Sequence, residues 1–166
     1  MRWRVLSVIG ALYAAQFIPL FFAIMALPII LRTVGHSATT IGLVQVAGLP
    51  YVFKFLWAPL IDKYRPGKDR YKSWILLLSV LHIGFVVLLA FTDPGGNLTL
   101  LFIALVLMVL AVSTQDVAVD ALSISLLRPS ERSMGATFQN FGAYAGAVVG
   151  GFGFLYLYSH IGWTIA

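Results

Sequence analysis

The sequence contains no cysteine, and only 10% of its 166 residues are charged. The absence of cysteine excludes disulfide bonds and thiol chemistry, and it leaves the redox compartment undetermined. The low charge accompanies 60% hydrophobic residues and a mean hydropathy of +0.94, values that a water-soluble domain of this size does not tolerate on its surface. The composition therefore predicts an integral membrane protein in contact with the lipid bilayer.

The chain also lacks a concentrated basic surface, although its net charge is +5. The lysines and arginines fall between apolar runs rather than in one patch or stripe. A nucleic-acid partner is therefore not expected, and the basic residues are better read as signals of membrane topology.

Five apolar stretches are long enough to cross a hydrocarbon core, which takes roughly 20 helical residues. They cover residues 5–31, 39–61, 73–91, 98–127 and 134–158. The links between them are short and rich in glycine, proline and charge, as helix ends are. Because the runs are continuous rather than alternating, a β-barrel is excluded. The sequence predicts an all-α membrane bundle, with SHIGWTIA at residues 159–166 as the start of a sixth span.

The basic residues also predict the orientation of the bundle, because cytoplasmic loops carry an excess of lysine and arginine. One side of the predicted spans has only Arg32. The other side has nine basic residues: Arg2, Arg4, Lys63, Arg65, Lys68, Arg70, Lys72, Arg128 and Arg132. This asymmetry predicts a cytoplasmic amino terminus.

Two aspartates interrupt the fourth apolar stretch, in the segment STQDVAVDA. An ionisable residue at the centre of a span costs about 2.5–3.5 kcal/mol, so each needs a partner, water or a position near the interface. Along a helix, Asp116 lies about 18 Å and Asp120 about 12 Å from Arg128, which places both in the inner half of the membrane. Their four-residue spacing puts them on one helix face, which Gln115 partly extends.

Two interpretations of this pair remain open. The aspartates are either structural, paired with basic groups near the inner boundary, or they line a transport pathway in which one binds a proton. Lys54 in YVFKFLWAPL has the same two readings, because its side chain either extends to the interface or pairs with an aspartate. His82 is alone on an apolar span, which favours a packing role over a proton relay.

Prolines interrupt the first two predicted spans and are expected to kink them. Polar side chains precede two of these prolines and are candidates for a substrate pathway: Tyr13, Gln16 and Gln45, together with Gln115 in the fourth span. Kinked helices near polar groups suit a transporter that rocks, and ordinary packing explains them equally well.

Glycines recur at helical spacing in the fifth span. Gly142, Gly146 and Gly150 form a groove into which another helix fits closely, with Gln139 on the same face. We expect this face to serve helix packing.

Three segments together resemble the AmpG-type muropeptide permeases of the major facilitator superfamily. They are YVFKFLWAPLIDKY, STQDVAVDA and LLRPSERSMGA, and the resemblance runs from about Gln16 to the end of the chain. Acetyl-CoA transporters share a related pattern, so the motifs specify the family better than they specify the substrate. Such permeases have twelve or more spans, which implies that residues 1–166 are a partial amino-terminal domain lacking the carboxy-terminal half.

The resemblance implies proton-driven import of amino-sugar and peptide muropeptides across the bacterial inner membrane, without a cofactor or metal. Asp116, Asp120 and Lys54 would then be the residues of transport and proton coupling. A charged gating loop follows the second span in this superfamily, and its matching residues are Asp62, Lys63, Lys68 and Arg70. Ala58 replaces the first glycine of that loop motif, and Ala147 replaces a proline that antiporters have in the fifth span.

Two other classes of function compete with a transporter. A membrane prenyltransferase needs a longer acidic cluster to hold Mg²⁺ and diphosphate, and TQDVAVD supplies only its last spacing. A non-functional fragment or an assembly partner is the other alternative. We expect no enzyme activity.

Overall fold

The structure is a computed structural model that describes residues 2–64 and 67–165. Arg65, one of the basic residues counted above, lies outside the described residues. Five helices in the described part are long and apolar enough to cross a membrane. These spanning helices, first to fifth, are Trp3–Thr33, Ala38–Leu56, Arg70–Ala90, Leu98–Leu126 and Pro129–Ile161. The predicted all-α membrane bundle is confirmed, and the described ranges contain no strand.

Three of the spanning helices are irregular. The first consists of α1 (Trp3–Phe21), a π-helical segment (Phe22–Ala26) and α2 (Leu27–Thr33). The second consists of α3 (Ala38–Gln45), a 3-10 turn (Val46–Gly48), α4 (Leu49–Phe53) and another 3-10 turn (Lys54–Leu56), and α5 (Ala58–Lys63) follows it. The fifth begins with a 3-10 turn (Pro129–Glu131) and continues as α8 (Arg132–Ala147), a π-helical segment (Val148–Gly153) and α9 (Phe154–Ile161). The third and fourth are the uninterrupted helices α6 (Arg70–Ala90) and α7 (Leu98–Leu126).

The proline positions explain the breaks in the second spanning helix. Pro50 and Pro59 stand in the first turns of α4 and α5, where a missing backbone N–H costs little. Each follows a 3-10 turn, because a proline cannot continue the hydrogen-bond ladder of the helix before it. Lys54 therefore lies on a short 3-10 turn between two helical pieces.

Side-chain caps fix the starts of two helices. The Ser37 hydroxyl accepts a hydrogen bond from the Thr40 backbone N–H at 3.1 Å, at the start of α3. The Asn97 side chain accepts from the backbone N–H groups of Thr99 and Leu100 at the start of α7. Such caps satisfy N–H groups that lack a partner within the helix.

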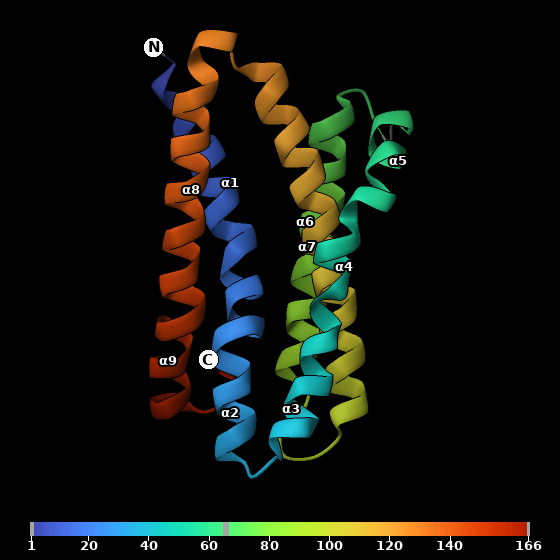
Figure 1. Ribbon diagram of the computed structural model, residues 1–166, viewed down its shortest axis with the longest axis vertical. Coiled ribbons are helices and arrows are strands. Elements are labelled where there is room, and N and C mark those ends of the chain that lie inside the picture. The colour runs from blue at the N-terminus through green and yellow to red at the C-terminus, as the bar shows by residue number, and fades with distance from the viewer. Residues whose placement is uncertain (1, 65–66, 166) are drawn as a thin grey trace.

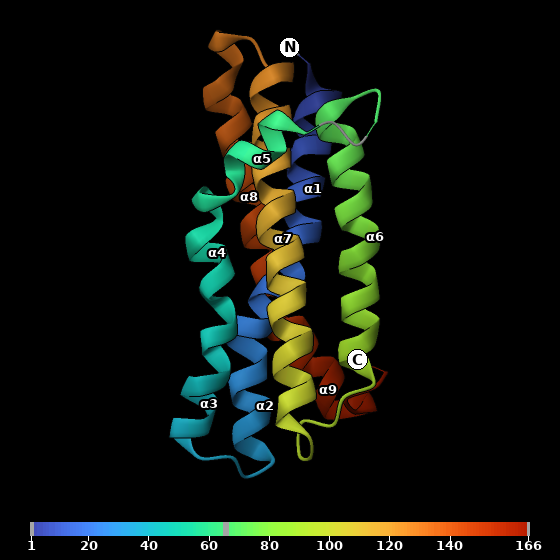
Figure 2. The same cartoon turned by 90° about the vertical axis from the view of Figure 1, so that its right-hand side faces the viewer.

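The helices form two groups that run side by side. Helix α1 packs along α8, and helix α6 packs along α7 (Figure 1). The second spanning helix runs beside α7 on the face away from α6 (Figure 2). The amino terminus, the α5–α6 connection and the α7–α8 connection lie at one end of the bundle (Figure 1).

The apolar core divides into two clusters along α7. One includes Leu101, Met108 and Val109 and packs against α2 and the start of the second spanning helix. The other includes Ala118 and Val119 and packs against α1 and the start of α6. Along α7, Ser113, Gln115 and Asp116 lie between the two clusters, and Asp120 follows Val119.

The chain turns sharply after α9. Gly162 has a φ of +78°, a left-handed conformation that favours glycine, and it ends the helix. Residues 163–165 form turns, and the Trp163 indole donates to the carbonyl oxygen of Leu89 at 3.2 Å. Through residue 165, the segment expected to begin a sixth span thus folds back against the third spanning helix.

Glycines allow α1 and α8 to approach closely. A Cβ atom on Gly142 would overlap the carbonyl oxygen of Gly10, and one on Gly150 would overlap that of Ile18. A Cβ atom on Gly146 would lie 2.8 Å from the Cβ of Phe17. The two backbones are in direct contact along this seam, as small residues allow in membrane helices.

This contact predicts that Gly150→Ala destabilises the protein. The added methyl group forces α1 and the fifth spanning helix apart, and overpacking of this kind costs about 1–3 kcal/mol. Gly153→Ala is the matched control, because its Cβ would meet no atom closer than 3.7 Å. Thermal unfolding of the purified protein in detergent measures both, and an equal midpoint for the two variants would contradict the packing role of the seam.

Candidate functional site

Asp116 is buried in the middle of the bundle, with 2% of its surface exposed. Lys54 forms an ion pair with its Oδ2 atom, and the Tyr51 hydroxyl donates to the same oxygen at 3.3 Å. The Gln16 amide donates to Oδ1 at 2.9 Å. Both carboxylate oxygens are thus satisfied by the first and second spanning helices.

Lys54 reaches across the bundle to Asp116 rather than extending toward the interface. Its ammonium group also lies 4.5 Å from the centre of the Tyr51 ring, a cation–π contact. The Lys54 side chain is 28% exposed, whereas that of Asp116 is 3% exposed. The pair therefore has one accessible partner and one buried partner.

Asp120 lies one turn further along α7 and has different partners. The Tyr13 hydroxyl on α1 donates to its Oδ1 atom, and the Gln139 amide on α8 donates to the same atom at 3.3 Å. The environment of Asp120 is partly buried. Both donors are uncharged at neutral pH.

The two aspartates connect four of the five spanning helices. They lie on the fourth, and their partners come from the first, second and fifth. Burying an ion pair costs desolvation energy, which good geometry and further hydrogen bonds offset. Removal of one partner leaves an uncompensated charge in the bundle, so the network is sensitive to a change in protonation.

The structure separates the four candidates for a substrate pathway. Tyr13 and Gln16 contact the aspartates, as described above. Gln45 instead donates to the backbone carbonyl of Ala23 at 3.1 Å. Gln115 donates to the Ser79 hydroxyl on α6 at 3.0 Å, on a different side of α7 from the carboxylates.

His82 is buried on α6, and within the described residues its Nε2 atom has no hydrogen-bond partner. It forms no hydrogen bond with Asp116 or Asp120 among the contacts that the described ranges contain. His82 is thus separate from the aspartate network.

The candidate gating residues lie where α5 ends and α6 begins: Asp62 and Lys63 on α5, Lys68 on the connection and Arg70 at the start of α6. Asp62 accepts a hydrogen bond from the Tyr71 hydroxyl at 3.0 Å, which ties the end of α5 to the start of α6. The basic groups of Lys63 and Arg70 lie over tyrosine rings at 5.6 and 5.7 Å. Lys68 is exposed in the same connection.

Sequence reasoning missed two members of the network, Tyr51 and Gln139. Tyr51 precedes Lys54 by three residues, a spacing that puts side chains on one side of a helix. The sequence places Gln139 on the same helix face as the glycines of the fifth span, but it does not indicate a contact with Asp120. Its contact with Asp120 requires the parallel packing of α8 on α1, which spacing along the chain does not reveal.

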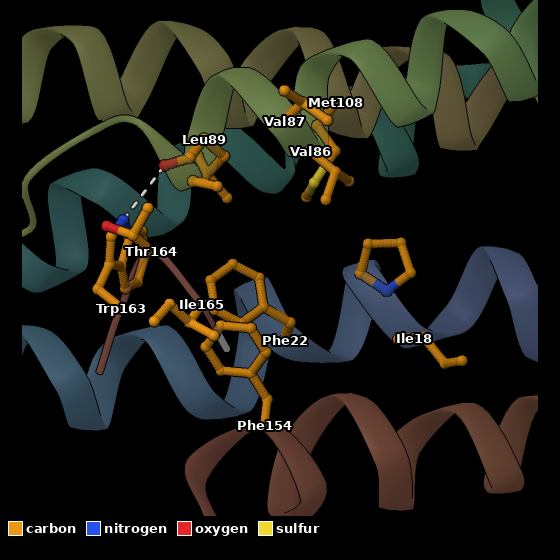
Figure 3. A pocket seen from close by; sticks show the side chains of 12 residues that line it. Ile18, Phe22, Val86, Val87, Leu89, Met108, Phe154, Trp163, Thr164 and Ile165 are labelled. Carbon is orange, nitrogen blue, oxygen red and sulfur yellow. Dashed lines mark hydrogen bonds between the residues drawn. The ribbon is translucent and has the colours of Figure 1, made fainter. Parts of the chain in front are cut away.

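The described residues contain no group of three or more His, Cys, Asp or Glu side chains that could hold a metal ion. An apolar pocket with a volume of about 340 Å³ lies elsewhere, between α1, α6 and α9. Phe22, Phe154 and Met108 line it, and the Trp163–Leu89 hydrogen bond borders it (Figure 3). This pocket has no charged lining residue and is distinct from the carboxylates.

Comparison with known proteins finds several transporters. The anhydromuropeptide permease of Escherichia coli K12 is 34% identical over 113 residues, which are 68% of this chain and 23% of that protein. A putative transporter AmpG 4 of Rickettsia felis is 31% identical over 143 residues, covering 84% of this chain and 34% of that protein. A putative transporter AmpG 3 of Rickettsia prowazekii is 29% identical over 164 residues, covering 94% of this chain and 38% of that protein.

These names confirm the resemblance to AmpG-type permeases that the sequence motifs indicate. The chain spans between 23% and 38% of the length of these three relatives. The model of the Major Facilitator Superfamily matches residues 9–166, which is nearly the whole chain. The chain therefore belongs to the Major Facilitator Superfamily of membrane transporters.

Proposed function

We propose that this chain is the amino-terminal part of a proton-coupled permease that imports muropeptides. The observation that carries the proposal is the buried network of Asp116, Asp120 and Lys54, which joins four spanning helices. Ionisable residues inside membrane spans are costly and typically mark ion pathways or proton relays.

For proton binding to be coupled to substrate transport, the change in charge of a carboxylate must alter the contacts between helices. The partners of the two aspartates come from three other spanning helices, so protonation of either carboxylate changes several interhelical contacts at once. A transporter that alternates between inward and outward access requires such a two-state element.

The names of the relatives support the substrate class. The relative from E. coli is an anhydromuropeptide permease, and an amino-sugar compound with a peptide is accordingly the proposed substrate. The relatives are also longer than this chain, which supports its being one part of a larger permease. In the same proposal the buried network serves transport and not catalysis. The residues that gate the cytoplasmic end of the pathway are Asp62, Lys63, Lys68 and Arg70.

The charge distribution supports a protein of the bacterial inner membrane whose amino terminus lies in the cytoplasm. The connections rich in lysine and arginine lie at the same end of the bundle as the amino terminus (Figure 1). Under the positive-inside rule this end faces the cytoplasm.

Uptake of labelled anhydromuropeptide tests the proposed activity. Cells that lack their own permease and express this protein from its complete gene should accumulate the label, and a protonophore should abolish the accumulation. Accumulation of an acetyl-CoA analogue instead would indicate that the protein is an acetyl-CoA-type transporter of the same superfamily. Accumulation that survives the protonophore would contradict proton coupling.

Replacement of either network aspartate is expected to remove accumulation. Asp116→Asn and Asp120→Asn should each abolish proton-driven uptake while the protein still inserts into the membrane, because an amide has neither the negative charge nor the exchangeable proton of a carboxyl group. Asp93→Asn is the matched control, since Asp93 lies on the exposed connection between α6 and α7. Normal uptake in both network variants would return the aspartates to a structural role.

The proposed topology is testable because the chain has no native cysteine. Val34 follows α2 and Ser130 lies between α7 and α8, and both are exposed. Single cysteines at these positions, Val34→Cys and Ser130→Cys, mark the connections at opposite ends of the bundle (Figure 1). In intact spheroplasts, a membrane-impermeant maleimide should label Val34→Cys and leave Ser130→Cys unlabelled until the cells are lysed. The reverse pattern would place the amino terminus outside.

The proposal that the chain is part of a longer permease is tested by reading the DNA beyond the codon of Ala166. An in-frame continuation that encodes further spans is expected. A stop codon at that point would favour a fragment or an assembly partner.

A further inference from the structure

Asp116 and Asp120 lie one helical turn apart, yet their partners differ in charge. Asp116 contacts a cation, the ammonium group of Lys54. Asp120 accepts hydrogen bonds from two neutral donors, Tyr13 and Gln139. Among the described residues, Lys54 is the one cation that forms an ion pair with either carboxylate.

The Asp116 site fits only the ionised carboxylate. Lys54 and Tyr51 both donate to Oδ2, and Gln16 donates to Oδ1. A proton on either oxygen would compete with these donors and would leave the Lys54 ammonium group without its anion. Unpaired charges in a buried site are strongly unfavourable, so the pair tends to stay ionised together.

The Asp120 site fits both protonation states. The hydrogen bonds from Tyr13 and Gln139 both end on Oδ1, and no described residue donates to Oδ2. A proton can therefore bind Oδ2 while Oδ1 continues to accept both hydrogen bonds. No cation loses its partner when Asp120 becomes neutral.

The single cation also limits the charge that the two carboxylates carry together. When both are ionised, the net charge of the three groups is negative, and the carboxylates repel each other across one turn. Binding of a proton at Asp120 removes this repulsion and leaves the Lys54–Asp116 pair balanced.

We infer that Asp120 is the residue that binds and releases the transported proton, on Oδ2, and that Asp116 remains the fixed anion of the Lys54 pair. The inference rests on the proposed proton coupling and assigns separate roles to the two carboxylates. The groups that face Asp120 are Tyr13 from α1, Gln139 from α8, Asp116 from its own helix and Lys54 from the second spanning helix.

Protonation of Asp120 has a consequence for helix packing. Hydrogen bonds to an ionised carboxylate are stronger than those to a neutral carboxyl group. Tyr13 and Gln139 lie on the two helices that the glycine seam joins, so they move as one unit. A proton on Asp120 therefore weakens the hydrogen bonds from Tyr13 and Gln139 that join α7 to the α1–α8 pair, while Asp116 keeps its contacts with Lys54 on the second spanning helix and with Gln16 on α1.

Difference infrared spectroscopy of the purified protein in proteoliposomes tests the assignment without any substrate. Acidification of the wild-type protein should produce the carbonyl band of a newly protonated carboxyl group in a protected environment. Asp120→Asn should lose this band, whereas Asp116→Asn should retain a band of similar area. Asp93→Asn, in an exposed connection, is the control for changes outside the bundle.

Each other result overturns the assignment. A band that persists in Asp120→Asn and disappears in Asp116→Asn would show that Asp116 is the residue that binds the proton. Loss in both variants would show that the two carboxylates titrate as one unit, and absence of the band from the wild type would show that neither takes up a proton. Because the spectra need no transport, failure of muropeptide uptake with the expected bands would reject only the proposed substrate.

Thermal unfolding of pair variants gives a second, independent measurement. Lys54→Met and Asp116→Asn should each lower the unfolding midpoint, because each strands one charge, and the double variant should recover most of that loss. Asp120→Asn should change the midpoint less than Asp116→Asn does. Equal effects of these two replacements, or an additive loss in the double variant, would remove the distinction between the fixed and the proton-binding carboxylate.

Discussion

A charge inside an apolar bundle must have a partner, and the Lys54–Asp116 ion pair is the contact on which the arrangement of the polar residues depends. Asp116 is almost completely buried on α7, and Lys54 is the cation that compensates it. The remaining donors to Asp116 come from Gln16 and Tyr51, so the first and second spanning helices are positioned around one carboxylate. Asp120 extends the network to α8 through Gln139.

Irregular backbone brings Lys54 to this place. The second spanning helix is interrupted before Pro50, α5 begins next to Pro59, and Lys54 lies on the 3-10 turn between α4 and α5. A break in a membrane helix exposes backbone polar groups, which is tolerated where the segment is buried in protein or lines a cavity. The break thus coincides with the polar centre of the bundle, where such groups find partners.

The glycine seam gives the bundle a second constraint. Gly142, Gly146 and Gly150 hold the backbones of α1 and the fifth spanning helix in contact, so Tyr13 and Gln139 keep a fixed spacing on one side of α7. The Lys54–Asp116 pair ties α7 to the helix on its other side. Asp116 thereby connects α7 to the second spanning helix and, through Gln16, to α1, whereas Asp120 connects α7 to the α1–α8 pair alone. A change of charge at Asp120 acts on that pair only.

The sequence by itself determined the membrane class, the number of spanning helices and the position of the two aspartates on one helix face. These follow from hydrophobic length and from the period of a helix, which are local properties of the chain. The partner of each aspartate was decided only by the tertiary structure, because partners come from helices up to 107 residues away along the chain. Lys54 illustrates the difference: its position in an apolar span was evident, while the choice between the interface and Asp116 depended on how the second spanning helix packs on α7.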